Sequence, residues 1–371
     1  MATVNELLRD ETVAHSVSLQ QYSLGVVRRM VALLNRVDAE LSAALIMALE
    51  NMPVESYTVE RMELLLASVR TLNAAAYDQV SRELQKDLSE LSGYESQWQS
   101  DLFDHLLPDP VKLRFPLARV TAEQAYAAAM SRPFQGRLLK DWGDDLAAGR
   151  MTVIRNAIRE GYLQGKTVAD IVRGIRGTKT EAFADGFLAR PRRDLESVVR
   201  AAVMHTASTA RSEFYKANES IVKALQWVST LDTKTSDPCR IRDHKNYTAD
   251  TKKPIGHKVP WLQGPGKIHW NCRSTETPIT KSWRELGIPV DEMTPGERAS
   301  MDGAVPGDTT YIEWLGRQSA ERQERVLGPM RYRMLQSGEI KMGDLYTPTG
   351  EFKTIDQLKG IDRVERLAQA A

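Results

Sequence analysis

The two cysteines of the chain lie in one short stretch, and each has a histidine nearby. Cys239 and His244 have the spacing C-x4-H, and His269 and Cys272 have the spacing H-x2-C. Thiolate sulfur and imidazole nitrogen are ligands that zinc prefers, and a site closed by four protein ligands is structural. A loop-rich module with few hydrophobic residues gains most from such a cross-link. The pattern therefore predicts a structural zinc ion held by all four residues, with the two cysteines and His269 as the best ligands.

Other interpretations of the same residues stay open. Asp243 or His257 could replace His244 as the fourth ligand. Without a metal, the two cysteines would be small buried residues, and His269 would form a hydrogen bond in the core. Two complete C-x2-C pairs would be a stronger indication of zinc than this mixed set. The metal and the buried-thiol interpretations are therefore both carried forward.

Catalytic interpretations of the cluster have less support. Asp243-His244 and His269-x-Asn271 partly resemble the His-Asn-His nucleases, but no histidine follows Asn271 within the module. A dyad of either cysteine with His269 would suit nucleophilic catalysis, yet no third group suggests itself to orient it. The sequence contains no P-loop, no His-Glu-x-x-His run and no Gly-x-Ser-x-Gly motif. We therefore expect no enzyme activity and keep a metal-dependent nuclease as the alternative.

Composition is that of a globular protein with two or three domains. The chain has 371 residues, 42% apolar and 27% charged. Its first residues show no secretory signal, and its longest apolar run, 43–49, is too short to span a bilayer. We therefore expect no membrane partner and a reducing compartment, where a structural disulfide is not expected.

Charge is unevenly distributed along the chain. Residues 1–120 hold 17 acidic and 11 basic side chains, a balance of −6, and the remainder holds 32 acidic and 39 basic, a balance of +7. The densest basic stretch is 155–200, which could contact nucleic acid or remain a solvated helix face. Its candidate nucleic-acid contacts are Arg173, Arg176, Lys179, Arg192 and Arg193.

Apolar periodicity predicts the elements that must position these residues. Steps of three and four indicate long helices over 5–50 and 58–106, and shorter helices over 121–218. Val222–Ser229 and Ser274–Ile279 are typical of strands. Capping-box spacing pairs Thr167 with Asp170 and Thr354 with Gln357, and Thr310 could cap a helix from residue 311.

These patterns predict a mainly α fold with a small α+β module. Long N-terminal helices are followed by a loop-rich module that zinc could cross-link and by a helical C-terminal segment. Four consecutive regions result: an N-terminal helical region at 1–120, a helical region at 121–220, the α+β Cys/His module at 221–285, and a linker with the C-terminal helical segment at 286–371. The Gly- and Pro-rich stretch 286–308 is the predicted linker.

The order of several motifs resembles a known family. The motifs run from Thr206 to Arg211 in a helix, from Trp227 to Asp232, from Thr235 to Cys239, and from His269 to Arg273. The series resembles the phage Mu F-like minor head proteins, or head morphogenesis proteins, of tailed phages. Their hallmark is an Asp, a Cys-containing turn, and a Pro-rich loop ending in His-x-Asn-Cys-Arg. A segment from Trp314 to Gly338 resembles one often found behind that domain, so the resemblance covers about residues 130–340.

The chain departs from the family pattern at three positions. Many members carry a second Cys three residues after the first and another after the hallmark Arg, where this chain has Arg242 and Ser274. His244 stands where a glycine is common, so its role as a ligand rests on its chemistry alone. A four-cysteine site is therefore excluded.

The resemblance implies a structural role in the virion. Such proteins occur in few copies, associate with the portal or the inner capsid, and assist head assembly, DNA packaging or DNA delivery. The expected partners are the portal protein, the major capsid protein or both, with packaged double-stranded DNA as a further contact. The expected location is the head interior or portal region, and the host cytoplasm during assembly. A DNA-binding module is the third functional class.

Overall fold

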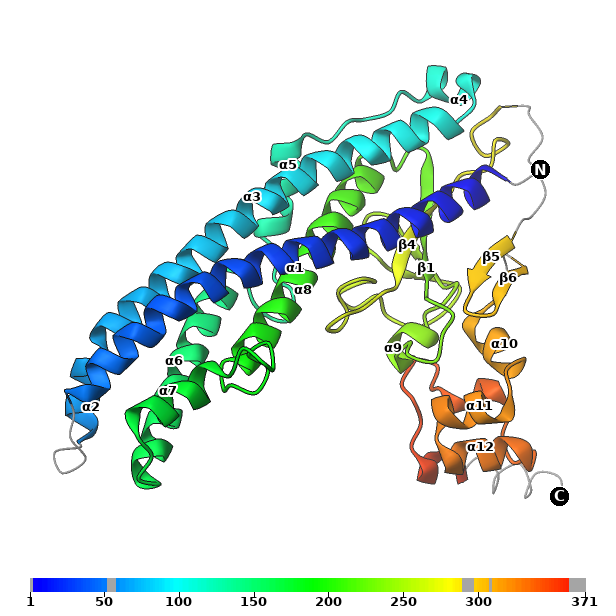
Figure 1. Cartoon of the computed structure of the whole chain (residues 1–371). Helices are drawn as coiled ribbons and strands as arrows, with labels where there is room; N and C mark the ends of the chain where they lie inside the picture. The colour runs from blue at the N-terminus through cyan, green and yellow to red at the C-terminus, as the bar shows by residue number, and fades with distance from the viewer. Residues whose placement is uncertain (1–2, 52–57, 289–296, 307–308, 360–371) are drawn as a thin grey trace. The chain divides into compact units, whose positions relative to one another are not determined.

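The chain is mainly helical and carries a small antiparallel sheet (Figure 1). The computed structural model describes residues 3–51, 58–288, 297–306 and 309–359. Within these residues, no helix is both long enough and apolar enough to cross a bilayer. The predicted fold class is confirmed.

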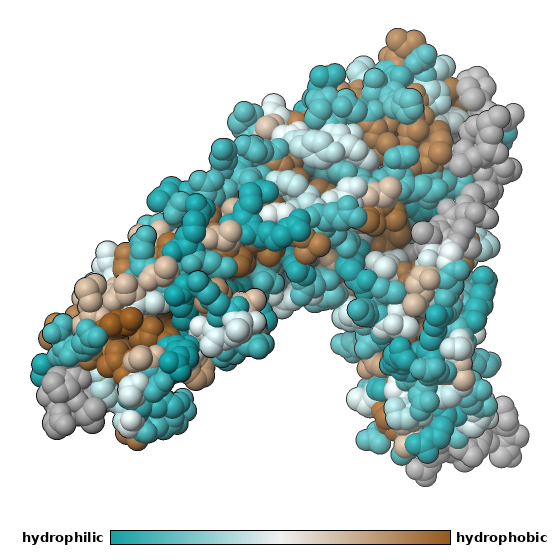
Figure 2. Space-filling model, viewed as in Figure 1, coloured by the Kyte–Doolittle hydropathy of each residue, from teal (hydrophilic) through white to brown (hydrophobic). Residues whose placement is uncertain are grey.

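Helices make up the chain before the first strand. They are α1 (Val4–Glu50), α2 (Val59–Leu65), α3 (Ala67–Leu106), α4 (Asp109–Arg114), α5 (Ala122–Met130), α6 (Leu139–Leu163), α7 (Val168–Arg176) and α8 (Ala189–Ala217). The two long helices expected near the N-terminus correspond to α1 and α3. Figure 2 shows mostly hydrophilic residues along the visible side of both, as expected for helices that bury their apolar stripes.

The chain folds into two compact units that interleave along the sequence. The first comprises Met1–Ser18, Glu95–Thr121 and Ser208–Ala371, and the second comprises Leu19–Tyr94 and Ala122–Ala207. Three of the four unit boundaries fall inside α1, α3 and α8, and the fourth falls just before α5. The four regions predicted from the sequence are consecutive, so they divide the chain differently from these units.

The second unit is built on a hydrophobic core shared by α1, α3 and α8. Val26 and Met30 of α1, Leu84 and Leu88 of α3, and Val203 of α8 are all buried in it. The α1 and α3 positions belong to the stripes that the apolar periodicity identifies, because residues three and four apart share a helix face.

A buried ion cluster lies in the same unit. The carboxylate of Asp38 is 3% exposed and accepts hydrogen bonds from two guanidinium groups. Arg150 of α6 donates to Oδ1, and Arg192 of α8 donates to Oδ2 at 2.6 Å. Arg192 also donates to the carbonyl of Phe183 at 3.0 Å. Because buried charges need partners, this cluster fixes the position of α6 and α8 relative to α1.

The sheet of the first unit contains β1 (Val222–Val228), β2 (Asn246–Thr248), β3 (Pro254–Ile255) and β4 (Thr275–Thr280). Its order is β3-β2-β1-β4, and every neighbouring pair is antiparallel. β1 and β4 match the two strands that the sequence predicts. The short helix α9 (Asp237–Arg240) lies between β1 and β2 in the chain.

The region predicted as a linker contains a β-hairpin. β5 (Glu297–Ser300) pairs with β6 (Gly303–Pro306) in an antiparallel sheet of its own. The remaining parts of 286–308 at 289–296 and 307–308 lie outside the described residues. Gly and Pro indicate turns, and strand propensity depends strongly on context, so two segments of four residues carry only a weak strand signal.

Helices follow the hairpin: α10 (Tyr311–Gly316), α11 (Ala320–Leu327) and α12 (Pro329–Gln336), and then the 3-10 helix η2 (Met342–Leu345). Thr310 caps α10 with a complete capping box to Glu313, so the predicted cap is confirmed. The predicted capping interactions of Thr167 and Thr354 also form.

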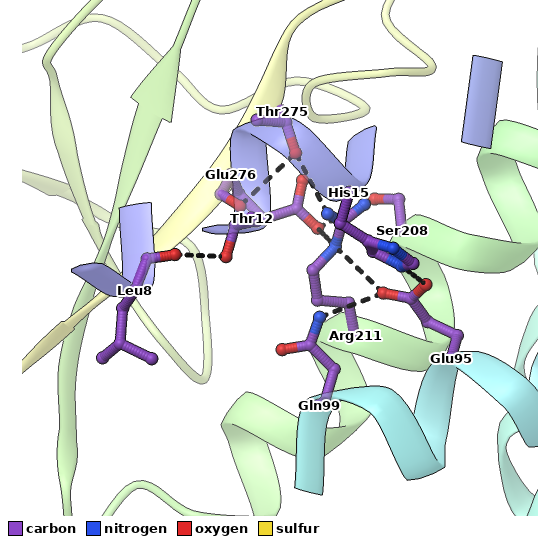
Figure 3. A network of polar contacts seen from close by, with 9 residues as sticks. All are labelled: Leu8, Thr12, His15, Glu95, Gln99, Ser208, Arg211, Thr275 and Glu276. Atoms are coloured by element: carbon purple, nitrogen blue, oxygen red, sulfur yellow. Dashed lines mark hydrogen bonds and ion pairs between the residues drawn. The ribbon is translucent and has the colours of Figure 1, made fainter. Parts of the chain in front are cut away.

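A second buried ionic network joins three helices of the first unit to the sheet (Figure 3). Glu95 of α3 contacts His15 of α1 at 2.6 Å, and the Arg211 guanidinium of α8 lies 3.7 Å from Glu95 and 3.5 Å from Glu276 of β4. Arg211 also donates to Thr275 at 3.1 Å. Burial alone would raise the pKa of Glu95, but Arg211 and the hydrogen bond from His15 outweigh burial and lower it. The network therefore anchors the start of β4 on the helices.

We predict that Glu95→Gln lowers the free energy of unfolding by about 3–5 kcal/mol, because it leaves the buried Arg211 short of one charged partner. Urea denaturation followed by circular dichroism measures this, with Glu90→Gln, at an exposed position of α3, as the matched control. A carboxylate with a lowered folded-state pKa stabilises the fold above its unfolded pKa of about 4.5 and loses that contribution as the pH falls. The difference between wild type and Glu95→Gln should therefore shrink on acidification. Equal stability of the wild type and Glu95→Gln at pH 7 would contradict a stabilising role for the Glu95 carboxylate.

Candidate metal centre

Two short backbone turns present the predicted ligands. Cys239 lies in α9, which begins after Ser236 and has a proline in its first turn. His269 and Cys272 lie in a tight turn just before β4, closed by a hydrogen bond from the Cys272 N–H to the His269 carbonyl at 3.2 Å. Asn271 between them adopts a φ of 56°, a left-handed conformation that asparagine tolerates better than most residues. The His-x-Asn-Cys sequence therefore forms a turn in which the side chains of His269 and Cys272 both reach the Cys239 sulfur.

The structure brings Cys239, His269 and Cys272 together. The Cys239 Sγ lies 3.6 Å from the Cys272 Sγ and 3.4 Å from the His269 Nε2, and the three ligand atoms lie within 4.8 Å of one another. Two zinc–sulfur bonds of about 2.3 Å at a tetrahedral angle put the sulfurs about 3.8 Å apart. Both cysteines are free thiols. The donor set and spacing therefore fit a metal ion, which this cluster could hold.

The ring of His269 is oriented for coordination through Nε2. Its Nδ1 lies 2.9 Å from the Trp270 carbonyl, to which it can donate only if it carries the proton. In the neutral ring the Nε2 is then the nitrogen that can bind a metal, and it lies 3.4 Å from the Cys239 Sγ and 2.7 Å from the Ser236 hydroxyl. Histidines that bind metals commonly donate their other ring N–H to such a carbonyl.

Proton sharing inside the cluster favours a thiolate at one cysteine. The hydrogen bond from Cys272, followed by that from His269, lowers the pKa of Cys239 to about 4. The same interaction with Cys239, together with burial, raises the pKa of Cys272 well above its usual value. The hydrogen bond to Cys239 also raises the pKa of His269. Because a metal needs two thiolates and a neutral imidazole, its binding would release protons from this group.

Side chains around the cluster fix the two turns to each other. Asp232 and Arg273 form a two-pronged ion pair, with N–O distances of 2.5 and 2.9 Å. Arg242 donates to the carbonyls of Pro238 at 2.6 Å and Pro260 at 2.9 Å. Ser229 donates to the Cys239 carbonyl at 2.8 Å. The cluster therefore does not depend on a single loop for its geometry.

Aromatic residues form the apolar wall of the site. Trp227 of β1, Tyr247 of β2 and the two cysteines form one buried cluster, with Trp261 packed against it. The Trp261 ring makes edge contacts with Trp227 at 5.4 Å and Tyr247 at 4.8 Å between centroids. This packing keeps both cysteines no more than 3% exposed.

The other predicted ligands lie elsewhere. Among the described residues, the metal-competent group contains only the two cysteines and His269, so His244 is outside it. The backbone of His244 adopts a φ of 61° and donates to the Trp227 carbonyl at 2.8 Å. Asp243 accepts backbone N–H groups with both oxygens, from Ser229 at 2.8 Å and Tyr311 at 2.7 Å.

His257, the second substitute ligand, has both ring nitrogens engaged. Its Nε2 lies 2.9 Å from the Asn246 carbonyl, and its Nδ1 accepts from the Val259 N–H at 3.2 Å. Burial chiefly lowers the pKa of His257. This histidine therefore connects β2 to the following loop and leaves no nitrogen for a metal.

The candidate nucleic-acid contacts do not form one exposed face. Arg173, Lys179 and Arg193 are exposed, and Arg173 forms an ion pair with Asp170 at 3.4 Å. Arg176 stacks over the Phe183 ring at 5.0 Å. Arg192 is buried and paired with Asp38, so it is not part of the surface. Sequence spacing alone does not separate Arg192 from Arg193, because the partner of Arg192 lies far away in the chain.

Two functional supports escape the sequence analysis. Ser236, which contacts His269, precedes an Asp-Pro pair, and Ser before Pro is a typical helix start that could have identified it. The hydrogen bonds by which Arg242 joins the two loops are not indicated by any local sequence pattern.

In comparisons with known proteins, no family, no curated protein and no solved structure matches this chain.

We predict that Cys272→Ser removes metal binding and loosens residues 235–280, while the long helices stay folded, because metal binding energy would stabilise only this module. Limited proteolysis and the metal content of purified protein measure the two effects. His244→Asn is the matched control, since asparagine tolerates the left-handed backbone at that position. This control should keep both the metal and the protection. Full protection of 235–280 in Cys272→Ser would argue against a structural metal.

Proposed function

We propose that this chain is a minor head protein of a tailed phage whose Cys/His module is held together by a structural zinc ion. It would associate with the portal or the inner capsid and assist head assembly, DNA packaging or DNA delivery. It would reside in the head interior or portal region of the virion, after assembly in the host cytoplasm. The zinc ligands would be Cys239, His269 and Cys272.

The observation that carries the proposal is the convergence of the family motifs. Asp232, Cys239 and the His269-to-Arg273 turn come from three separate stretches of the chain, yet they form one cluster with an ion pair at its edge. Arg211 of the helical motif reaches β4 through Thr275. Residues that resemble a family hallmark and also build one site support membership more strongly than spacing does.

The segment from Trp314 to Gly338, which also resembles the family, packs as a unit and supports the same proposal. Gln323 of α11 donates to the carbonyls of Gly316 and Gln318 at 3.2 and 2.8 Å. Arg331 of α12 donates to the Lys353 carbonyl at 2.9 Å and stacks over Phe352. These polar contacts close the C-terminal helices around a buried core that includes Trp314.

The hydrogen bonds of Asp243 favour a structural metal over a nuclease centre. The nuclease alternative needs this residue as a metal or base group, together with His244 and His269. Both oxygens of Asp243 accept backbone N–H groups, and His244 lies outside the cluster. The buried cysteines supply soft ligands that suit zinc rather than the magnesium common in nucleases.

We predict that the purified chain co-purifies with an assembled portal ring, or pellets with capsids, at moderate salt. Apolar residues left exposed on α1, such as Leu24 at 43%, offer surface for partner helices. Size-exclusion chromatography of chain and portal together, with each alone as a control, measures the first interaction. A chain that stays monomeric beside the portal and also fails to pellet with capsids would contradict the proposal.

A further inference from the structure

A pocket of about 340 Å³ lies within the second unit, between α6 and the segment that opens α8. One wall comes from one face of α6 and includes Asn156 and Glu160. The other comes from residues 184–193 and includes Phe187, Arg190 and Arg193. Its size is within the range of small-molecule and cofactor sites.

The wall before α8 is held rigidly. A Cβ on Gly186 would lie 2.3 Å from the Gly177 nitrogen, so only glycine at position 186 allows these two segments of backbone to approach so closely. Thr178 donates to both carboxylate oxygens of Asp185, at 2.8 and 2.9 Å. The Phe187 N–H donates to the Gly174 carbonyl at 3.0 Å. The pocket is therefore built by the fold before any ligand arrives.

The chemistry of the pocket combines cations with an exposed aromatic ring. Among the described residues, the guanidinium groups of Arg190 and Arg193 have no hydrogen-bond or ion-pair partner, and both are exposed. They are three residues apart on α8, so they share a helix face. Phe187 is 49% exposed although it is a large apolar residue. Two arginines without ion-pair partners can bind an anionic group, and an exposed aromatic ring can stack on a planar one. The pocket therefore suits a ligand that carries both groups.

We propose that this pocket binds one nucleotide unit. Arg190 and Arg193 hold the phosphate, the base stacks on Phe187, and Asn156 and Glu160 face the base or sugar with hydrogen-bonding groups. The Glu160 carboxylate is steadied by Gln164, which donates to it at 2.9 Å. The same chemistry is offered by a free nucleotide and by a single-stranded nucleic-acid chain. The inference does not rest on the metal centre or on the phage-head proposal.

Fluorescence anisotropy of the full chain tests this, with a labelled oligothymidylate, a labelled mononucleotide and a labelled duplex as probes. Arg190→Gln and Arg193→Gln should each weaken binding about 10-fold, and each should reduce the salt slope by about 0.7. Phe187→Ala should weaken it about 10-fold, and Phe187→Trp should retain it. Arg159→Gln, at an exposed arginine of α6 outside the pocket lining, is the charge-matched control and should bind as wild type does.

The probes separate the two sources of the ligand. Binding of the mononucleotide alone identifies a free nucleotide, and tighter binding of the oligothymidylate identifies a single strand. Either result, with the variant pattern above, supports the proposal. Equal loss in Arg159→Gln, preference for the duplex, or binding that is unchanged in Phe187→Ala would overturn it, because each indicates general attraction to phosphate. Absence of binding by every probe at low salt would overturn it as well.

Discussion

The buried network of Glu95, Arg211 and Glu276 is the constraint on which the first unit depends. Each of these side chains is at most 1% exposed, so none can be solvated by water. Removing Arg211 would leave two buried carboxylates without their shared guanidinium group, which is strongly destabilising. The network therefore holds α3, α8 and the start of β4 in one arrangement. Because Cys272 lies three residues before β4 begins, the position of this candidate ligand depends on helix contacts far away in the sequence.

The second unit also contains a buried ionic cluster, but in this one the arginines outnumber the carboxylates. There, one buried carboxylate, Asp38, meets two guanidinium groups, from Arg150 and Arg192. Such clusters contribute less to net stability than equally large apolar contacts, because their desolvation cost is high. They do specify geometry, since few alternative packings satisfy every charge. A basic stretch in the sequence thus divides into an interior arginine that positions helices and surface arginines that remain available to a ligand.

Local patterns predicted much of this structure, and long-range contacts account for the rest. The apolar periodicity identified α1 and α3, alternation identified β1, and side-chain caps identified the start of α10. Three of the four proposed ligands converge: His269 and Cys272 share one locally determined turn, and Cys239 reaches them from α9, 33 residues before Cys272. The location of His244 was not predictable, since it depends on a left-handed residue beside the β1–β2 pairing. The roles of Asp243 and Arg192 depend on partners 68 and 154 residues away.

The central claim is that two thiolates and one imidazole hold a zinc ion in this module. X-ray absorption spectroscopy at the zinc edge of the purified full chain tests it most directly. The account predicts about one zinc per chain, with two sulfur neighbours at about 2.3 Å and nitrogen or oxygen neighbours at about 2.0–2.1 Å. Protein that carries no zinc after purification and reconstitution, or a zinc shell without sulfur, would contradict it.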